Sequence, residues 1–111
     1  MSPAVAFKVF LVEDAERDIE DIHAYITAHG SLERAGDVVD ALEELCASLT
    51  ELPERGNVPK ELRDLGITDY RELHHEPYRV VYRIIGDRVV ISCVLDGRRD
   101  MESLLQRRLF R

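Results

Sequence analysis

Two long apolar runs meet at Gly86-Asp87, and this junction constrains the fold more than any other part of the sequence. The runs span 78–85 and 88–95 and are rich in the β-branched and aromatic residues that favour strands. A tight two-residue connection containing glycine joins neighbouring antiparallel strands. A third strand is expected over 70–74, connected through Glu76-Pro77. The sequence therefore predicts a three-stranded antiparallel meander.

The first half of the chain predicts one strand followed by two helices. Residues 4–12 alternate between apolar and other side chains, which is typical of a strand. Asp14 is the expected N-cap of a helix that ends at Gly30, and Ser31 is the expected N-cap of the next helix. Both helices are acidic and amphipathic. The short connection favours an antiparallel hairpin whose apolar faces cover one face of the sheet.

The remaining segments complete a single domain over 1–111. Pro53 and Gly56 stop the second helix, and 51–69 reads as an ordered connection with turns. Asp100 is the expected N-cap of a short C-terminal helix. The predicted order is β-α-α-β-β-β with a helical tail, an α+β fold of a size that supports one core.

Several functional classes are not favoured by the composition. No apolar run approaches the roughly 20 residues that span a bilayer, and the first residues lack the basic region of a secretion signal, so a cytoplasmic location is expected. Cys46 and Cys93 each fall in an apolar pattern, which favours reduced core residues. His23 and His29 lack a partner at ligand spacing, so neither a metal nor another cofactor is expected.

Charge is divided unevenly between the two halves. Residues 1–54 carry thirteen acidic and three basic side chains, whereas 55–111 carry nine acidic and twelve basic ones. Eleven of those twelve are arginines, whose planar donor fork suits phosphates and carboxylates. An anionic partner is therefore expected to bind the second half.

The strand over 78–85 separates its side chains into two faces. One face, expected to pack on the helices, carries Tyr78, Val80, Tyr82 and Ile84. The opposite face carries Arg79, Val81 and Arg83. The next strand is apolar on both faces, which would leave Val90 and Val94 uncovered. Uncovered apolar area beside arginines favours a partner surface.

The order of short motifs resembles the RelE/ParE superfamily of bacterial toxins. The stretch YRELHHEPYRVVYRIIGDRVVISCVLDGRRDMESLLQRRL resembles the second half of these toxins, in which a YR-x-x-Y strand, a short hairpin and a strand ending in G-[KR]-R recur. The first half agrees through its strand, its DIEDIHAYI helix, its second helix and its LPERG turn. The resemblance implies an α+β fold in which a sheet backed by two helices forms a groove for an antitoxin.

The RelE-like branch of this superfamily cleaves mRNA on the ribosome. Such cleavage requires a base, cations to stabilise charge on the phosphate, and an acid. Arg79 and Arg99 match two arginines of that branch, but its paired lysines fall at Tyr70 and Glu72, and its C-terminal tyrosine falls near Leu105. Histidines replace such groups in some relatives, and here His74 and His75 are the candidates.

The ParE-like branch acts on DNA gyrase and fits the sequence better. The chain lacks the lysines, is acidic overall, and contains the ParE-type phrases PERG, DYREL and GRRD. The resemblance implies a toxin that is neutralised by a cognate ParD-like antitoxin in a hetero-oligomer. The residues expected to bind target or antitoxin are Arg71, Arg79, Val81, Arg83, Val90, Val94, Arg98, Arg99, Arg107 and Arg108.

Two alternatives to a gyrase inhibitor remain open. The first is a ribosome-dependent endoribonuclease whose catalytic residues would be Arg79, Arg99, His74 and His75. The second is a degenerate module that binds an antitoxin but has no toxicity.

Overall fold

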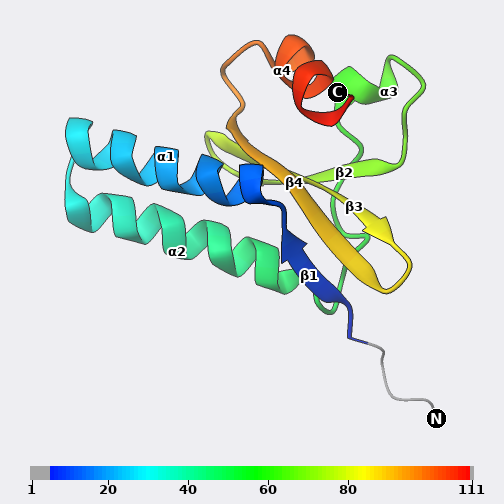
Figure 1. Ribbon diagram of the computed structural model, residues 1–111, viewed down its shortest axis with the longest axis horizontal. Coiled ribbons are helices and arrows are strands. Elements are labelled where there is room, and N and C mark those ends of the chain that lie inside the picture. Colours follow the sequence, from blue (N-terminus) through cyan, green and yellow to red (C-terminus); the bar gives the residue numbers. More distant parts are fainter. Residues whose placement is uncertain (1–5, 111) are drawn as a thin grey trace.

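A single four-stranded sheet with helices on both faces forms the body of the protein. The computed structural model describes residues 6–110. In chain order its elements are β1 (Lys8–Leu11), α1 (Glu13–His29), α2 (Leu32–Ser48), α3 (Lys60–Arg63), β2 (Tyr70–His75), β3 (Tyr78–Ile85), β4 (Arg88–Asp96) and α4 (Met101–Leu109). The strand order is β1-β4-β3-β2, with β1 parallel to β4 and the other pairs antiparallel. The predicted α+β fold is confirmed (Figure 1).

The sheet has an apolar core on each face because β3 and β4 are apolar on both sides. The α1–α2 hairpin covers the face that carries Val80, Tyr82 and Ile91. The other face carries a second cluster, in which Val81 and Cys93 pack with side chains from α3 and α4. The hairpin lies to one side of the sheet, and α3 and α4 lie together away from it (Figure 1). The predicted division of the β3 side chains between two faces is therefore confirmed.

A β-bulge in β4 changes which of its side chains face the hairpin. Val81 pairs with Cys93 whereas Tyr82 pairs with Ile91, so Ser92 is an extra residue in β4. The bulge reverses the alternation, which places Val94 on the hairpin face, where it is buried. The expectation that Val94 is uncovered beside Val90 was therefore wrong.

Val81, which was expected among the residues that bind target or antitoxin, is covered by other parts of the chain. It does face away from the hairpin, but its exposed fraction is 0% because α3 and α4 close over that part of the sheet. The covering residues include Leu62, Met101 and Leu105. Neither Val81 nor Val94 is accessible to a partner in this conformation.

Helix boundaries follow the predicted capping residues, with one exception. Ser31 and Asp100 each accept a hydrogen bond from the backbone N–H three residues on, as expected of N-caps. Val12 rather than Asp14 is the N-cap of α1. Asp14 lies instead in the acidic first turn, where a negative charge interacts favourably with the helix dipole. Of the strand predicted over 4–12, β1 covers Lys8–Leu11, and residues 4 and 5 lie outside the described residues.

The PERG segment is held against the sheet by the side chain of Tyr82. The Tyr82 hydroxyl donates a hydrogen bond to the Pro53 carbonyl at 2.7 Å and accepts one from the Gly56 N–H at 3.0 Å. A Cβ atom at Gly56 would lie 2.5 Å from this hydroxyl oxygen, so only glycine fits. Burial raises the pKa of Tyr82. The connection over 51–69 is therefore ordered at its start by a specific contact.

Both cysteines are buried and free, as predicted. Cys46 lies in the hairpin-side core and Cys93 in the core under α4, so the sheet separates them. Burial raises the pKa of Cys46 to about 11 and that of Cys93 to about 12. Among the described helices, none is long and apolar enough to cross a membrane.

Candidate functional site

A cleft of about 340 Å³ lies where the β2–β3 turn, α3 and the loop after β4 meet, and we call it the Arg79 cleft. The residues that line it are Lys60, Glu61, Glu72, His74, Glu76, Pro77, Arg79, Gly97 and Arg98. It therefore contains several charged groups of both signs and one of the predicted histidines.

Two carboxylates surround the guanidinium of Arg79. Its Nη1 and Nη2 atoms donate to the two carboxylate oxygens of Glu61 at 2.9 and 2.7 Å, and its Nε donates to Glu72. The side chain of Arg79 is 13% exposed and that of Glu72 is 4% exposed. The hydrogen bonds that Arg79 donates to Glu61 lower the pKa of Glu61 and raise the pKa of Arg79. The local sum of these three charges is negative.

Gly97 allows Arg79 to occupy this position. A Cβ atom at Gly97 would lie 2.6 Å from Cδ of Arg79, so a larger residue would displace the arginine stem. The glycine of the GRRD phrase thus has a packing role. Sequence reasoning missed Glu61, because it lies in the connection before β2, 18 residues from Arg79, and no local pattern marks it.

His74 is the one predicted histidine that reaches the cleft. It lies opposite Arg79 on β2, and its Nε2 is 3.5 Å from Oε2 of Glu72. Its side chain is 42% exposed. His75 is the next residue on β2, so its side chain points to the other face of the sheet. His74 and His75, which were alternative candidates for a catalytic role, therefore lie on opposite faces of the sheet.

Besides Arg79, three of the predicted docking arginines donate hydrogen bonds within the chain: Arg71, Arg98 and Arg108. Arg71 donates to the carbonyls of Glu54 and Gly56 at 3.0 and 2.8 Å, which ties the PERG segment to β2.

Arg108 donates to both carboxylate oxygens of Asp18 and so joins α4 to α1, and the bonds raise the pKa of Arg108. Arg98 donates to Asp96 and remains exposed, and this bond lowers the pKa of Asp96. Within residues 6–110, Arg83, Arg99 and Arg107 form no ion pair within 4 Å. Arg99 lines a cleft of about 480 Å³ beside Tyr25 and Tyr78.

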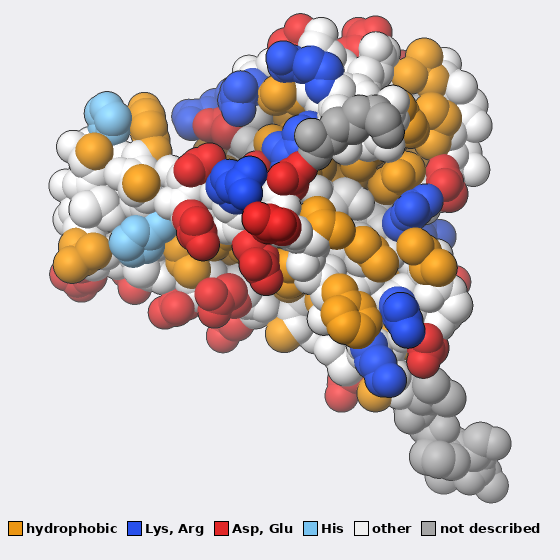
Figure 2. All heavy atoms as spheres, viewed as in Figure 1, with side chains coloured by type: hydrophobic (Ala, Val, Ile, Leu, Met, Phe, Trp, Pro, Cys, Tyr) orange, Lys and Arg blue, Asp and Glu red, His pale blue; other side chains and the backbone are white. Residues whose placement is uncertain are grey.

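Part of the sheet face below α4 remains uncovered, and we call it the open strip. Its residues are Phe10, Arg83, Ile85, Arg88 and Val90. Phe10 is 46% exposed, and the guanidinium of Arg88 lies 5.7 Å from the centre of its ring. The guanidinium of Arg83 likewise lies 5.5 Å from the centre of the Tyr70 ring. Hydrophobic and basic side chains intermingle on the right of Figure 2, where Figure 1 places the strands.

The described residues give no sign of a metal centre, since none of their histidine, cysteine, aspartate or glutamate side chains gather in groups of three that could hold an ion. The chemistry offered by this surface is therefore that of its arginines, its carboxylates and His74.

Solved structures with the same fold are toxins and toxin complexes. The chromosomal ParDE toxin-antitoxin system from P. aeruginosa is similar with a TM-score of 0.68 at 20% identity, over 80% of this chain and 94% of that one. The toxin-antitoxin complex RelBE2 from Mycobacterium tuberculosis has a TM-score of 0.61 at 22% identity, over 86% of this chain and 97% of that one. A mutant of the E. coli toxin RelE in the free state has a TM-score of 0.60 at 17% identity, over 89% of this chain and 92% of that one.

These similarities show that the protein has a RelE/ParE-like fold. A model of the family described as "ParE toxin of type II toxin-antitoxin system, parDE" matches residues 9–101. The chain therefore belongs to the ParE toxin family. The comparison with curated proteins finds no match.

Proposed function

We propose that this protein is a toxin that acts by binding DNA gyrase and not by cleaving RNA. The observation that carries the proposal is the neutralised state of Arg79, which donates to Glu61 and Glu72 at once. RNA cleavage needs a cation that is free to stabilise charge on the phosphate. Here a phosphate entering the cleft would meet an arginine whose charge is already balanced by two carboxylates.

The positions that match the lysines of the RelE-like branch also favour binding over cleavage. Tyr70 and Glu72 lie on the same sheet face as Arg79, and Leu105 is completely buried in the core beneath α4. None of these three side chains supplies a cation, and Leu105 carries no proton to transfer. Family membership in the ParE group supports gyrase as the target.

The partner that neutralises the toxin is, on this proposal, a cognate ParD-like antitoxin. Its acidic amphipathic segment would lie on the open strip, with carboxylates at Arg83 and Arg88 and apolar side chains at Phe10 and Val90. Two arginines held over aromatic rings are already positioned for such contacts, so less conformational entropy is lost on binding.

The direct test measures both candidate activities with one preparation of purified protein. We expect inhibition of DNA supercoiling by gyrase and intact mRNA in a translating extract to which the protein is added. Cleavage of mRNA without any effect on gyrase would overturn the proposal. Induced expression without an antitoxin should also arrest growth, and unchanged growth would favour the degenerate module.

A ribosome-dependent endoribonuclease is the second candidate, and one observation favours it. His74 lies in the Arg79 cleft, 3.5 Å from Glu72, and Lys60 lines the same cleft. On this alternative, His74 would accept the proton of the attacking hydroxyl, and Lys60 would supply a cation to the phosphate.

Substitution of His74 tests this candidate. If His74 is the general base, His74→Ala should abolish growth arrest because the proton acceptor is removed, whereas His75→Ala should retain it. Circular dichroism of both variants checks that they fold. Growth arrest that is unchanged in His74→Ala would exclude the histidine mechanism, and the gyrase proposal expects that result.

A further inference from the structure

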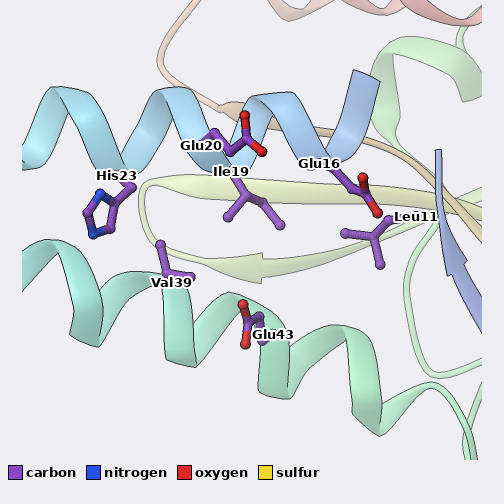
Figure 3. Close-up of a pocket in the computed structure, with 7 residues that line it drawn as sticks. All are labelled: Leu11, Glu16, Ile19, Glu20, His23, Val39 and Glu43. Atoms are coloured by element: carbon purple, nitrogen blue, oxygen red, sulfur yellow. The ribbon is translucent and has the colours of Figure 1, made fainter. Parts of the chain in front are cut away.

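A groove of about 580 Å³ lies between α1 and α2 and extends to Leu11 at the end of β1, as Figure 3 shows. Its floor is apolar and is made by Leu11, Ile19 and Val39. Its rim carries three carboxylates, Glu16 and Glu20 on α1 and Glu43 on α2, and His23 of α1 also lines it. The groove thus combines apolar surface with carboxylates on both sides.

These rim carboxylates have no partner within the described part of the chain. The side chains of Glu16, Glu20 and Glu43 form no hydrogen bond or ion pair there, whereas Asp18 on α1 accepts hydrogen bonds from Arg108. Glu16 and Glu20 are four residues apart on α1, and like charges at this spacing destabilise a helix by about 0.2–0.5 kcal/mol. The repulsion between these two side chains therefore opposes helix formation, although Glu16 in the first turn interacts favourably with the helix dipole.

The net charge of the whole α1–α2 hairpin is strongly negative, which favours a positively charged partner. Residues 13–48 carry eleven carboxylates and two arginines. One of the two, Arg17, pairs with Glu13 and Asp14 and does not line the groove. Acidic side chains gather over the two helices in Figure 2. Such a surface repels phosphates, so neither a nucleic acid nor an anionic lipid surface fits it.

We propose that this groove binds a basic amphipathic segment of a partner protein. Apolar side chains of the segment would lie on Ile19 and Val39, and lysines or arginines beside them would pair with Glu16, Glu20 and Glu43. The open strip has the opposite charge and suits an acidic segment. The two surfaces therefore select different sequences, and the proposal holds whether the toxin acts on gyrase or on the ribosome.

The test uses a synthetic amphipathic peptide of about 14 residues, roughly four helical turns, with leucines on one face and flanking lysines. A control peptide carries glutamates in place of the lysines. Fluorescence anisotropy measures the binding of each labelled peptide to the full chain. We expect the lysine peptide to bind and the glutamate peptide not to bind.

Two matched triple variants distinguish binding in the groove from attraction to the overall negative charge of the hairpin. Glu16→Gln/Glu20→Gln/Glu43→Gln should weaken binding of the lysine peptide by about tenfold, because three rim contacts are lost. Glu33→Gln/Asp37→Asn/Glu44→Gln removes three exposed acidic charges that do not line the groove, and should weaken binding less than about twofold. Val39→Asn should also weaken binding, because it makes part of the floor polar.

Three results would overturn the proposal. An equal loss in both triple variants would indicate diffuse attraction to the acidic hairpin. Unchanged affinity in Val39→Asn would show that the floor is not used. A dimer of the protein alone that dissociates in the rim variant, seen by sedimentation, would identify a second copy of this chain as the occupant.

Discussion

Replacement of Arg79 by methionine is expected to lower the free energy of unfolding by about 3–5 kcal/mol. The reason is that the buried side chain of Glu72 would lose the cation that compensates its charge. Glu61 would also be released, which removes the ion pair between α3 and β3. Urea denaturation followed by circular dichroism at pH 7 measures the loss.

Two further variants identify the cause of that loss. Arg98→Met removes an exposed arginine that pairs with Asp96, and should change stability little. Arg79→Met/Glu72→Gln removes the buried charge together with its partner and should be more stable than Arg79→Met alone. If the double variant is no more stable than the single one, the unpaired carboxylate is not the source of the effect.

The effect of Arg79→Met should also depend on pH. Arg79 lowers the pKa of Glu61 from its ordinary value of 4.5, so the ionised carboxylate stabilises the folded state above that pH. This contribution is lost as the pH falls through the lowered pKa. The difference in stability between the wild type and Arg79→Met should therefore narrow in acid.

Gly56→Ala is expected to cost about 2–4 kcal/mol of stability, because the new methyl group overlaps two groups that are held in place. It would lie 2.5 Å from the Tyr82 hydroxyl and 2.6 Å from the carbonyl oxygen of Glu72. Relief of this overlap would break the hydrogen bonds that Tyr82 makes to Pro53 and Gly56. Urea denaturation again measures the change.

Gly36→Ala is the matched control for this substitution. Gly36 lies inside α2, and a Cβ atom there meets nothing within 4 Å. The replacement should raise stability by about 0.5–1 kcal/mol because alanine restricts the unfolded chain. If Gly56→Ala does not lower the free energy of unfolding by more than the amount that Gly36→Ala raises it, the role assigned to the PERG turn is contradicted.

Alternation and turn residues made much of the fold predictable. The period of two along 78–85 assigned Val80 and Tyr82 to the helix-covered face, and Gly86-Asp87 located the hairpin. Ser31 marked the start of α2. Each of these signals depends on residues near one another in the chain, where backbone preference and burial act locally.

The candidate site was predictable only in part. Arg79 and His74 were both expected at a functional surface, and both line the Arg79 cleft. The neutralisation of Arg79 by Glu61 was not foreseen, because α3 is a single turn in a long connection whose docking no periodic pattern encodes. The exposure predicted for Val94 failed because one extra residue in a strand reverses every later side chain.

The sequence by itself determined the elements, their order, the faces of β3 and the resemblance to a toxin family, because these depend on local periodicity and short motifs. Only the tertiary structure decided which charges meet, such as Arg108 with Asp18 across 90 residues of chain. It also decided that α4 covers Val81 while the open strip stays accessible. Such pairings depend on how distant elements dock, and the free energy of docking is shared among many contacts that no single segment encodes.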